Sequence, residues 1–485
     1  MTDTKFAHTV EKIGGTSMSR TAELLDTVLK GNRKGPALYN RIFVVSAYAG
    51  ITDALLEHKK SGEPGVYSLF ARAEGGWAWG DALTGVLERM YALNRAIFSD
   101  DMACRTADQF VRERVEGVRS CLIDLTRLCS FGHFQLEQHL LSVREMLSSL
   151  GEAQSAFNTS LLLDLAGVNA RFVDLTGWRE DRQLTLDETI AQAFADVDPS
   201  RELPIVTGYA QCSEVLMGTY DRGYSEVTLS RLAVVTGARE AIIHKEFHLS
   251  SADPNVVGAD VVRVIGETNY DVADQLSNMG MEAIHPRAAK GLRQAGIPLR
   301  VKNAFEPEHD GTLIRADLDA PTPQVEIITG LKNVYAFEFH DPDMVGVKGY
   351  DAKILDALRR HKIWIISKTS NANTITHFLK GSMQAVKRVE ADLSDAFPSA
   401  EIQLRKVSLV SAIGRNLGDA AVLTKAIGVL AAAGIQPLGV NDLIRKVDLQ
   451  VIVDPADFEA TLSALHKGLI EDRTSAGQAP LHAAA

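Results

Sequence analysis

The segment KIGGTS, residues Lys12 to Ser17, is the first whose residue types could do chemistry. It follows a short apolar run and precedes a helical pattern that extends to Lys30, which predicts a turn between a strand and a helix. Adjacent glycines let a backbone approach a ligand closely and leave N–H groups directed at it. Lys12 with Gly14 and Gly15 therefore predicts an anion cradle, although an ordinary turn with an exposed lysine explains these six residues equally well. The pattern is not a P-loop, because the lysine precedes the glycines.

Two further segments place polar groups beside apolar elements. In VVSAYAGITD, residues 44–53, the hydroxyls of Ser46 and Thr52 follow a predicted buried strand. Open α/β sheets bind ligands at the carboxyl ends of their strands, so both hydroxyls are candidates for substrate binding. In GEAQS, residues 151–155, Glu152 lies within an apolar helical stretch, and a solvated helix face is the ordinary interpretation of such a carboxylate.

The segment DRGYSEVT, residues 221–228, combines charges of both signs at the predicted start of a helix. Arg222 precedes a glycine turn, and Ser225 and Glu226 follow it. A guanidinium can hold a carboxylate at two points, and a helix N-terminus adds positive potential. Such a combination suits a zwitterionic ligand.

An alternation of strands and helices must position these segments. A buried strand is predicted over Arg41–Ala47, and further strands are predicted over Ala170–Val173, Leu203–Thr207, Ala241–Ile243 and Pro298–Lys302. Helical patterns separate them, which indicates an α/β domain with a parallel sheet over residues 1–317. Between residues 58 and 150 apolar residues recur only at helical spacing, so we expect a helical insertion there.

In the C-terminal third, predicted strands and helices follow one another at shorter intervals than in the preceding domain. Residues 318–324 form a polar linker with prolines, and two stretches of similar strand and helix order follow it. We expect two small α+β modules, over 325–400 and 401–472, and a disordered tail over 473–485.

Composition excludes several classes of protein. The chain of 485 residues has 51 Lys and Arg against 62 Asp and Glu, a net charge of −11 that argues against nucleic acid as a partner. Its four cysteines show no zinc-site spacing, so we expect no protein-held metal. Apolar runs are far shorter than the ~20 residues that span a bilayer. With no apolar segment at the N-terminus, we expect no cleaved signal and a cytoplasmic location.

The four polar segments, in their order, resemble the signatures of aspartokinases. KIGGTS, VVSAYAGIT, GEAQS and DRGYSEVT are similar to K-[FIV]-G-G-T-S, V-V-S-A-x-x-G-x-T, G-E-x-x-S and G-R-G-G-S-D-x-T. Ser251 to Pro254 resembles the family's T-A-D-P nucleotide loop, and HKEFHLSSADPN with GMEAIHPRAAK resembles the subgroup associated with ectoine synthesis. The resemblance implies a three-layer α/β/α amino acid kinase domain with a helical insertion, followed by two ACT-like modules.

The resemblance also implies an activity, phosphorylation of the L-aspartate side chain by ATP to give 4-phospho-L-aspartate. It implies that Mg²⁺ bridges the ATP phosphates, that threonine or lysine acts as feedback effector, and that the chain forms a homodimer or larger homo-oligomer. The implied catalytic residues are Lys12, Gly14 and Gly15. The implied substrate-binding residues are Ser46, Thr52, Glu152, Arg222, Ser225 and Glu226. The implied nucleotide-binding residues are Gly14, Gly15, Thr16, Ser17, His244, Lys245, Ser250, Asp253 and Pro254.

Several positions depart from the family pattern. Tyr224 replaces the third glycine and Glu226 the aspartate of G-R-G-G-S-D, and His244-Lys245 stands where Thr-Asp is usual. Two alternatives therefore stay open. One is a related amino acid kinase that acts on glutamate or N-acetylglutamate, and the other is an ACT-containing amino acid sensor with weak or lost catalysis.

Overall fold

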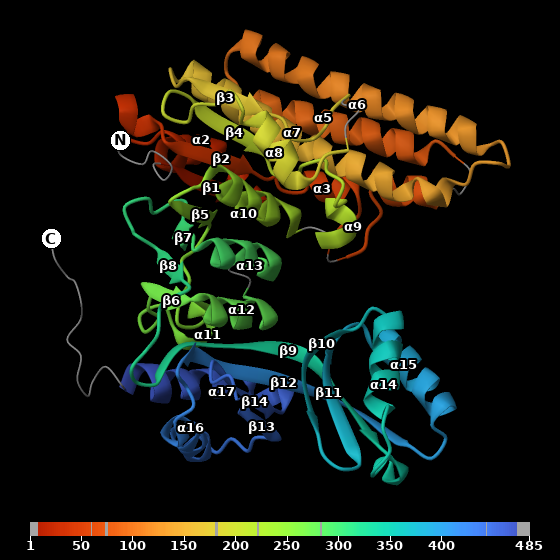
Figure 1. Cartoon of the computed structure of the whole chain (residues 1–485), viewed down its shortest axis with the longest axis vertical. Coiled ribbons are helices and arrows are strands. Elements are labelled where there is room, and N and C mark those ends of the chain that lie inside the picture. Colours follow the sequence, from red (N-terminus) through yellow and green to blue (C-terminus); the bar gives the residue numbers. More distant parts are fainter. Residues whose placement is uncertain are drawn as a thin grey trace. The chain divides into compact units, whose positions relative to one another are not determined.

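The computed structural model describes residues 8–59, 61–72, 76–179, 183–220, 223–281, 284–442 and 444–472 (Figure 1). The chain divides into two compact units, Met1–Leu249 with Ile284–Ala316, and Ser250–Ala283 with Asp317–Ala485. The second unit thus takes a segment, Ser250–Ala283, that the sequence analysis assigns to the domain over 1–317. The reason is apolar packing, because Val272, Leu276 and Met279 join a core with Ile327 and Leu409.

The first unit is built on a largely parallel sheet. Its strands follow the order β3-β4-β2-β1-β5-β7-β8, with only β8 antiparallel to its neighbour β7. Every residue of β2 and of β4 is buried, as expected for β-branched runs covered on both faces. The strands are β1 Thr9–Ile13, β2 Arg41–Val45, β3 Ala170–Val173, β4 Leu203–Thr207, β5 Glu240–Lys245, β7 Leu299–Asn303 and β8 Thr312–Arg315.

Helices cover the sheet of the first unit. They are α1 Gly15–Met18, α2 Thr21–Leu24, η2 Leu25–Leu29, η3 Gly35–Leu38, α3 Ile51–Leu55, α4 Val66–Ala71, α5 Ala78–Ile97, α6 Asp101–Cys129, η4 Leu136–Gln138, α7 Leu140–Leu165, α8 Leu186–Ala193, α9 Leu216–Tyr220, α10 Tyr224–Thr236 and α13 Pro286–Ala295. The long helices α5, α6 and α7 lie side by side (Figure 1). Helix α7 runs through residue 150, the expected end of the insertion, because its apolar periodicity continues from Leu147 to Ala153 and no proline interrupts it. A helix that begins in the insertion therefore carries Glu152.

The second unit contains an antiparallel sheet of six strands in the order β10-β11-β9-β12-β14-β13. The strands of this sheet are β9 Gln324–His340, β10 Trp364–Ser370, β11 Thr374–Lys380, β12 Glu401–Arg415, β13 Gly439–Asp442 and β14 Asp448–Val453. The short strand β6 Glu267–Asn269 belongs to the second unit but not to this sheet. Its helices are α11 Pro254–Val257, α12 Tyr270–Asn278, η6 Pro342–Met344, α14 Tyr350–Arg360, α15 Met383–Ala396, α16 Ala420–Ala432, η7 Pro455–Asp457, α17 Phe458–His466 and η8 Lys467–Glu471.

Two cores of the second unit share the long strands β9 and β12. Tyr335 to Phe339, in the second half of β9, pack with α14, α15 and the first half of β12. Val325 and Ile328, in the first half of β9, instead pack with α16, α17 and the second half of β12. A bulge marks the border, where two residues of β9 oppose Ser408 and Asn333 takes a left-handed φ of 59°.

The modules expected over 325–400 and 401–472 therefore exchange strand halves. A boundary at 400 falls at the start of β12, whose first residues pack with the earlier core. The expected linker over 318–324 ends where β9 begins, at Gln324, and the expected tail over 473–485 lies outside the described residues. These domain limits stay predictions. No helix in the described part of the chain is long and apolar enough to cross a membrane.

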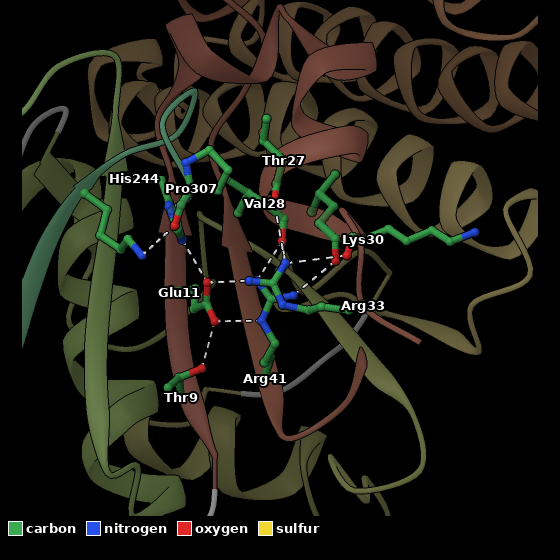
Figure 2. Close-up of polar contacts among 11 residues, drawn as sticks. Thr9, Glu11, Thr27, Val28, Lys30, Arg33, Arg41, His244 and Pro307 are labelled. Carbon is green, nitrogen blue, oxygen red and sulfur yellow. Dashed lines mark hydrogen bonds and ion pairs between the residues drawn. The ribbon is translucent and has the colours of Figure 1, made fainter. Parts of the chain in front are cut away.

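A buried ionic cluster joins the three central strands β1, β2 and β5 (Figure 2). Arg41 holds Glu11 at two points, with Nε 2.8 Å from Oε1 and Nη2 3.1 Å from Oε2. The hydroxyl of Thr9 donates to Glu11 Oε1 at 2.8 Å, and His244 Nε2 lies 2.7 Å from Oε2. Arg41 also donates to the carbonyl oxygens of Val28 and Leu29. The cluster thus ties three strands and one helical segment together.

The surroundings of Glu11 and His244 determine which of the two side chains is charged. Burial alone would raise the pKa of Glu11, but the charge of Arg41 and the hydrogen bond from His244 hold it well below its usual range. Burial lowers the pKa of His244 although Glu11 opposes that effect. Glu11 is therefore an anion paired with Arg41, and neutral His244 donates its Nε2 proton to it.

Replacing Glu11 with alanine should lower the free energy of unfolding by about 3–5 kcal/mol, because it leaves the guanidinium of Arg41 buried without its carboxylate. The midpoint of urea denaturation measures this change. The contribution of Glu11 should be present at neutral pH and disappear as the pH falls through its depressed pKa. Glu23→Ala, which breaks the exposed pair of Arg20 and Glu23, is the control and should leave the midpoint unchanged. Equal shifts for both variants would refute the structural role of Glu11.

Candidate active site

Lys12 and Glu226 meet at the carboxyl end of β1. Side chains alternate along a strand, so Lys12 lies on the face opposite to Glu11. Its Nζ lies 3.5 Å from Oε1 of Glu226, with exposed side-chain fractions of 13% and 12%. The other oxygen of Glu226 accepts a hydrogen bond from the backbone N–H of His285, which caps α13. Glu226 therefore ties Lys12 to two helices.

The glycine turn opens beside the Lys12 ammonium. Gly14 is extended, with φ −72° and ψ 157°, and a Cβ there would lie 4.0 Å from Lys12 Nζ and from the carbonyl oxygen of His244. A Cβ on Gly15 would instead lie 2.5 Å from the carbonyl oxygen of Ala47. The first glycine leaves room next to the ammonium, and the second allows the turn after β1 to pack on the turn after β2.

The remaining residues of the glycine segment differ in surroundings. Thr16 is exposed. Ser17 is buried, and its hydroxyl donates to Glu246 Oε1 at 2.6 Å. The Ser17 side chain is thus held by a carboxylate in this structure.

The turn after β2 lies against the glycine turn. The N–H of Ser46 donates to the carbonyl oxygen of Ile13 at 3.2 Å. Both Ser46 and Thr52 are half-buried, and Thr52 lies in the first turn of α3 after Gly50, whose φ of 80° suits glycine. Helix α7 comes close at Ala47, because a Cβ on Gly151 would lie 2.6 Å from the Ala47 Cβ. This close approach brings Glu152 to the same turn.

Glu152 is buried, with a relative exposure of 2%, so the interpretation as a solvated helix face is wrong. The hydroxyl of Tyr224 donates to its Oε1 at 2.8 Å, while Oε2 is buried and has no hydrogen-bond partner among the described residues. Burial raises the pKa of Glu152 to about 7, although the Tyr224 hydroxyl, the backbone of Ala47 and the charge of Lys12 act in the opposite direction. Near neutral pH this carboxyl changes between charged and neutral forms.

Helix α10 supplies Ser225 beside Glu226. Ser225 is buried, and its Oγ would lie 2.8 Å from a Cβ on Gly208, in the turn after β4. The hydroxyl of Thr228 donates to the carbonyl oxygen of Gly208 at 2.8 Å, which fixes the helix on this turn. Arg222 lies outside the described residues, and its role stays a prediction.

The expected nucleotide-binding residues fall into two groups. His244 and Lys245 end β5 in the first unit, and the ring of His244 is engaged by Glu11 (Figure 2). Ser250, Asp253 and Pro254 belong to the second unit. There, Ser250 Oγ donates to the carbonyl oxygen of Ala252 at 3.0 Å, and Asp253 accepts from the N–H of Asn255 at 2.9 Å.

The structure thus brings together Lys12 at the end of β1, Gly14 and Ser46 in neighbouring turns, Glu152 in the middle of α7 and Glu226 in the first turn of α10, all in one unit. The sequence analysis missed Tyr224 as a partner of Glu152 and treated it only as a departure from a pattern. The signal was its place two residues before Glu226, at the start of a helix with polar groups. The partnership itself spans 72 residues of sequence, so no local pattern reveals it.

The two glycines should respond differently to substitution. Gly15→Ala should lower the melting temperature, because its Cβ would overlap a backbone oxygen that cannot move alone. Gly14→Ala should leave the melting temperature unchanged, because its Cβ meets nothing closer than 4.0 Å. Differential scanning fluorimetry of both variants tests this difference. Equal destabilisation by the two substitutions would contradict it.

Comparisons with known proteins identify the family of this chain. Residues 8–303 match the model of the amino acid kinase family. The chain is 54% identical over 464 residues to aspartate kinase Ask_Ect of Stutzerimonas stutzeri (strain A1501), across 96% of this chain and 98% of that protein. It is 24% identical over 496 residues to the chloroplastic aspartokinase 2 of Arabidopsis thaliana, across 95% of this chain and 84% of that protein.

A solved structure confirms the fold class predicted from the sequence. Aspartokinase III of E. coli, in complex with lysine and aspartate, matches with a TM-score of 0.73 at 18% identity, across 96% of this chain and 100% of that one. The family model covers more than half of the chain, and the identity to Ask_Ect extends over nearly all of it. The chain belongs to the amino acid kinase family and, within it, to the aspartate kinases.

Proposed function

We propose that this chain transfers the γ-phosphoryl group of ATP to the side-chain carboxylate of L-aspartate, which yields 4-phospho-L-aspartate and ADP. The observation that carries the proposal is the position of the Lys12 ammonium beside Gly14. The buried carboxyl of Glu152 lies near enough for the charge of Lys12 to lower its pKa. The identity to Ask_Ect supports aspartate as the substrate and the ectoine-associated subgroup as the place of this chain.

The central difficulty of this reaction is the approach of two anions. A carboxylate and a γ-phosphate at ~4 Å repel each other by about 4 kcal/mol per unit-charge pair at an effective dielectric near 20. Lys12 is the group that offsets this repulsion and the charge that develops on the transferring oxygens. The aspartate oxygen bonds to the γ-phosphorus while the bridging oxygen departs with ADP. No general base is required, because the carboxylate is already ionised at neutral pH.

Glu152 is the better of two carboxylates for the substrate ammonium. Both oxygens of Glu226 are engaged, one by Lys12 and one by the N–H of His285. Glu152 keeps Oε2 without a partner among the described residues. We therefore assign the ammonium to Glu152 and give Glu226 the task of holding Lys12. Ser46, Thr52 and Ser225 would orient the substrate, and Arg222 would bind its α-carboxylate.

Gly14, Gly15 and Thr16 would approach the phosphates of the nucleotide, and Ser17 would support their turn. The ring of His244 is committed to Glu11, so His244 would act through its backbone, with Lys245, Ser250, Asp253 and Pro254 as further nucleotide contacts. Among the described residues no group of three or more His, Cys, Asp or Glu side chains is arranged to hold a metal ion. Mg²⁺ would therefore enter with ATP as part of the substrate.

The second unit would regulate the first. The E. coli structure named above holds lysine and aspartate, which supports an amino acid effector, threonine or lysine, for the ACT-like modules of this chain. We also propose a homodimer or larger homo-oligomer formed through these modules. We also propose a cytoplasmic location, which is supported by the bacterial origin of the similar kinase Ask_Ect.

A hydroxamate assay with ATP and Mg²⁺ tests the function and separates the alternatives. Aspartate should give acyl phosphate, whereas glutamate and N-acetylglutamate should not. Lys12→Ala should abolish turnover but leave aspartate binding intact, because Lys12 acts on the phosphoryl group. Activity on glutamate alone would favour the related kinase, absence of any turnover would favour a sensor, and near-normal activity of Lys12→Ala would remove Lys12 from catalysis.

The pH dependence of kcat/KM for aspartate should report Glu152. Only its ionised form binds an ammonium, and its pKa is about 7, so kcat/KM should fall about tenfold per pH unit below that value. Glu152→Gln should lower kcat/KM at high pH and abolish this acid limb. Steady-state assays between about pH 5.5 and 8.5 measure it. A flat profile for the unaltered chain would contradict the assignment.

A further inference from the structure

We propose that Tyr224 is a positioning residue for the substrate amino group. Its hydroxyl occupies Oε1 of Glu152 and thereby leaves Oε2 as the acceptor for the ammonium. The inference rests on the proposed function, because it concerns the residue assigned to the ammonium. Tyr224 stands where the aspartokinase pattern has a glycine, so the pattern itself gives it no role.

The contact between Tyr224 and Glu152 joins two helices. Tyr224 is the first residue of α10 and Glu152 lies in α7, and each has a relative exposure of 2%. Their hydrogen bond of 2.8 Å lies within the protein interior. The ring of Tyr209 packs edge-to-face on Tyr224, with 5.6 Å between ring centroids. The phenol is therefore held in place by packing as well as by its hydrogen bond.

The same helix carries a second tyrosine–glutamate pair that serves as an internal comparison. Glu145 lies seven residues before Glu152, which puts both carboxylates on one face of α7. The hydroxyl of Tyr209 donates to Glu145, and the N–H of Met217 donates to its other oxygen. Within the described part of the chain, Glu145 thus has both oxygens engaged, whereas Glu152 has only one.

The open oxygen of Glu152 is costly for a protein without a ligand. A buried carboxylate oxygen without a hydrogen bond keeps its desolvation penalty, and a charged donor from a ligand would relieve it. Lys12 from β1 is the charged group that acts on this carboxyl, and Tyr224 from α10 and Tyr209 from the turn after β4 are the titratable groups that face it. The hydrogen bond from Tyr224 also lowers the pKa of Glu152.

Removal of the hydroxyl should have two effects on aspartate binding. Glu152 would lose the contact that fixes its orientation, and its pKa would rise because a hydrogen bond to the charged form is gone. Tyr224→Phe should therefore raise KM for aspartate by about tenfold and move the acid limb of kcat/KM to higher pH. KM for ATP and kcat at saturating aspartate should change by less than about twofold, since Lys12 is untouched.

Tyr209→Phe is the matched control. It removes a phenol hydroxyl from the neighbouring ring and from the neighbouring glutamate, but it leaves Glu152 with its partner. This variant should keep the aspartate KM and the position of the acid limb. Equal changes in both variants, or an unchanged KM and pH profile in Tyr224→Phe, would overturn the proposal.

Calorimetric titration of L-aspartate into the full chain, without nucleotide, separates this inference from the function on which it rests. Binding that is about tenfold weaker in Tyr224→Phe than in Tyr209→Phe supports the positioning role. Equal affinity in the two variants overturns that role and leaves the proposed function standing. If the unaltered chain shows neither aspartate binding nor turnover in the hydroxamate assay, both the function and the inference are refuted.

Discussion

The pairing of Glu11 with Arg41 is the constraint on which the catalytic unit depends. Charges removed from water are costly, and a buried pair persists only where the geometry is good and the remaining polar atoms are satisfied. Here the guanidinium meets the carboxylate at two points, and Thr9, His244 and two carbonyl oxygens complete the set. The cluster fixes β1 between its neighbours. Because side chains alternate along a strand, the same fixation directs Lys12 to the opposite face, where Glu226 holds it.

Several elements followed directly from the sequence. The strands Ala170–Val173 and Leu203–Thr207 are found with the predicted bounds, and every residue of the second is buried. Lys12, Glu152 and Glu226 were singled out by residue type and by resemblance, and the structure places all three around the turns that follow β1 and β2. The local sequence pattern was sufficient to predict a strand wherever a continuous apolar run is buried.

Other features depend on contacts between distant residues. The burial of Glu152 follows from the close approach of α7 to Ala47, about a hundred residues away, and its partner Tyr224 lies 72 residues further along. The grouping of Ser250–Ala283 with the C-terminal unit arises from the apolar face of α12, which packs on a sheet formed later in the chain. A helix period predicts that such a face exists but does not identify the surface that covers it.

The strands β9 and β12 carry one further consequence. Each contributes to the two cores described above, on either side of the bulge at Asn333, and β9 alone comprises 17 residues. Because the same two strands enter both cores, a ligand that displaces them in one core also displaces them at the border with the other. No single cut of the chain separates the two cores. We therefore expect both to respond together when a ligand binds to either one.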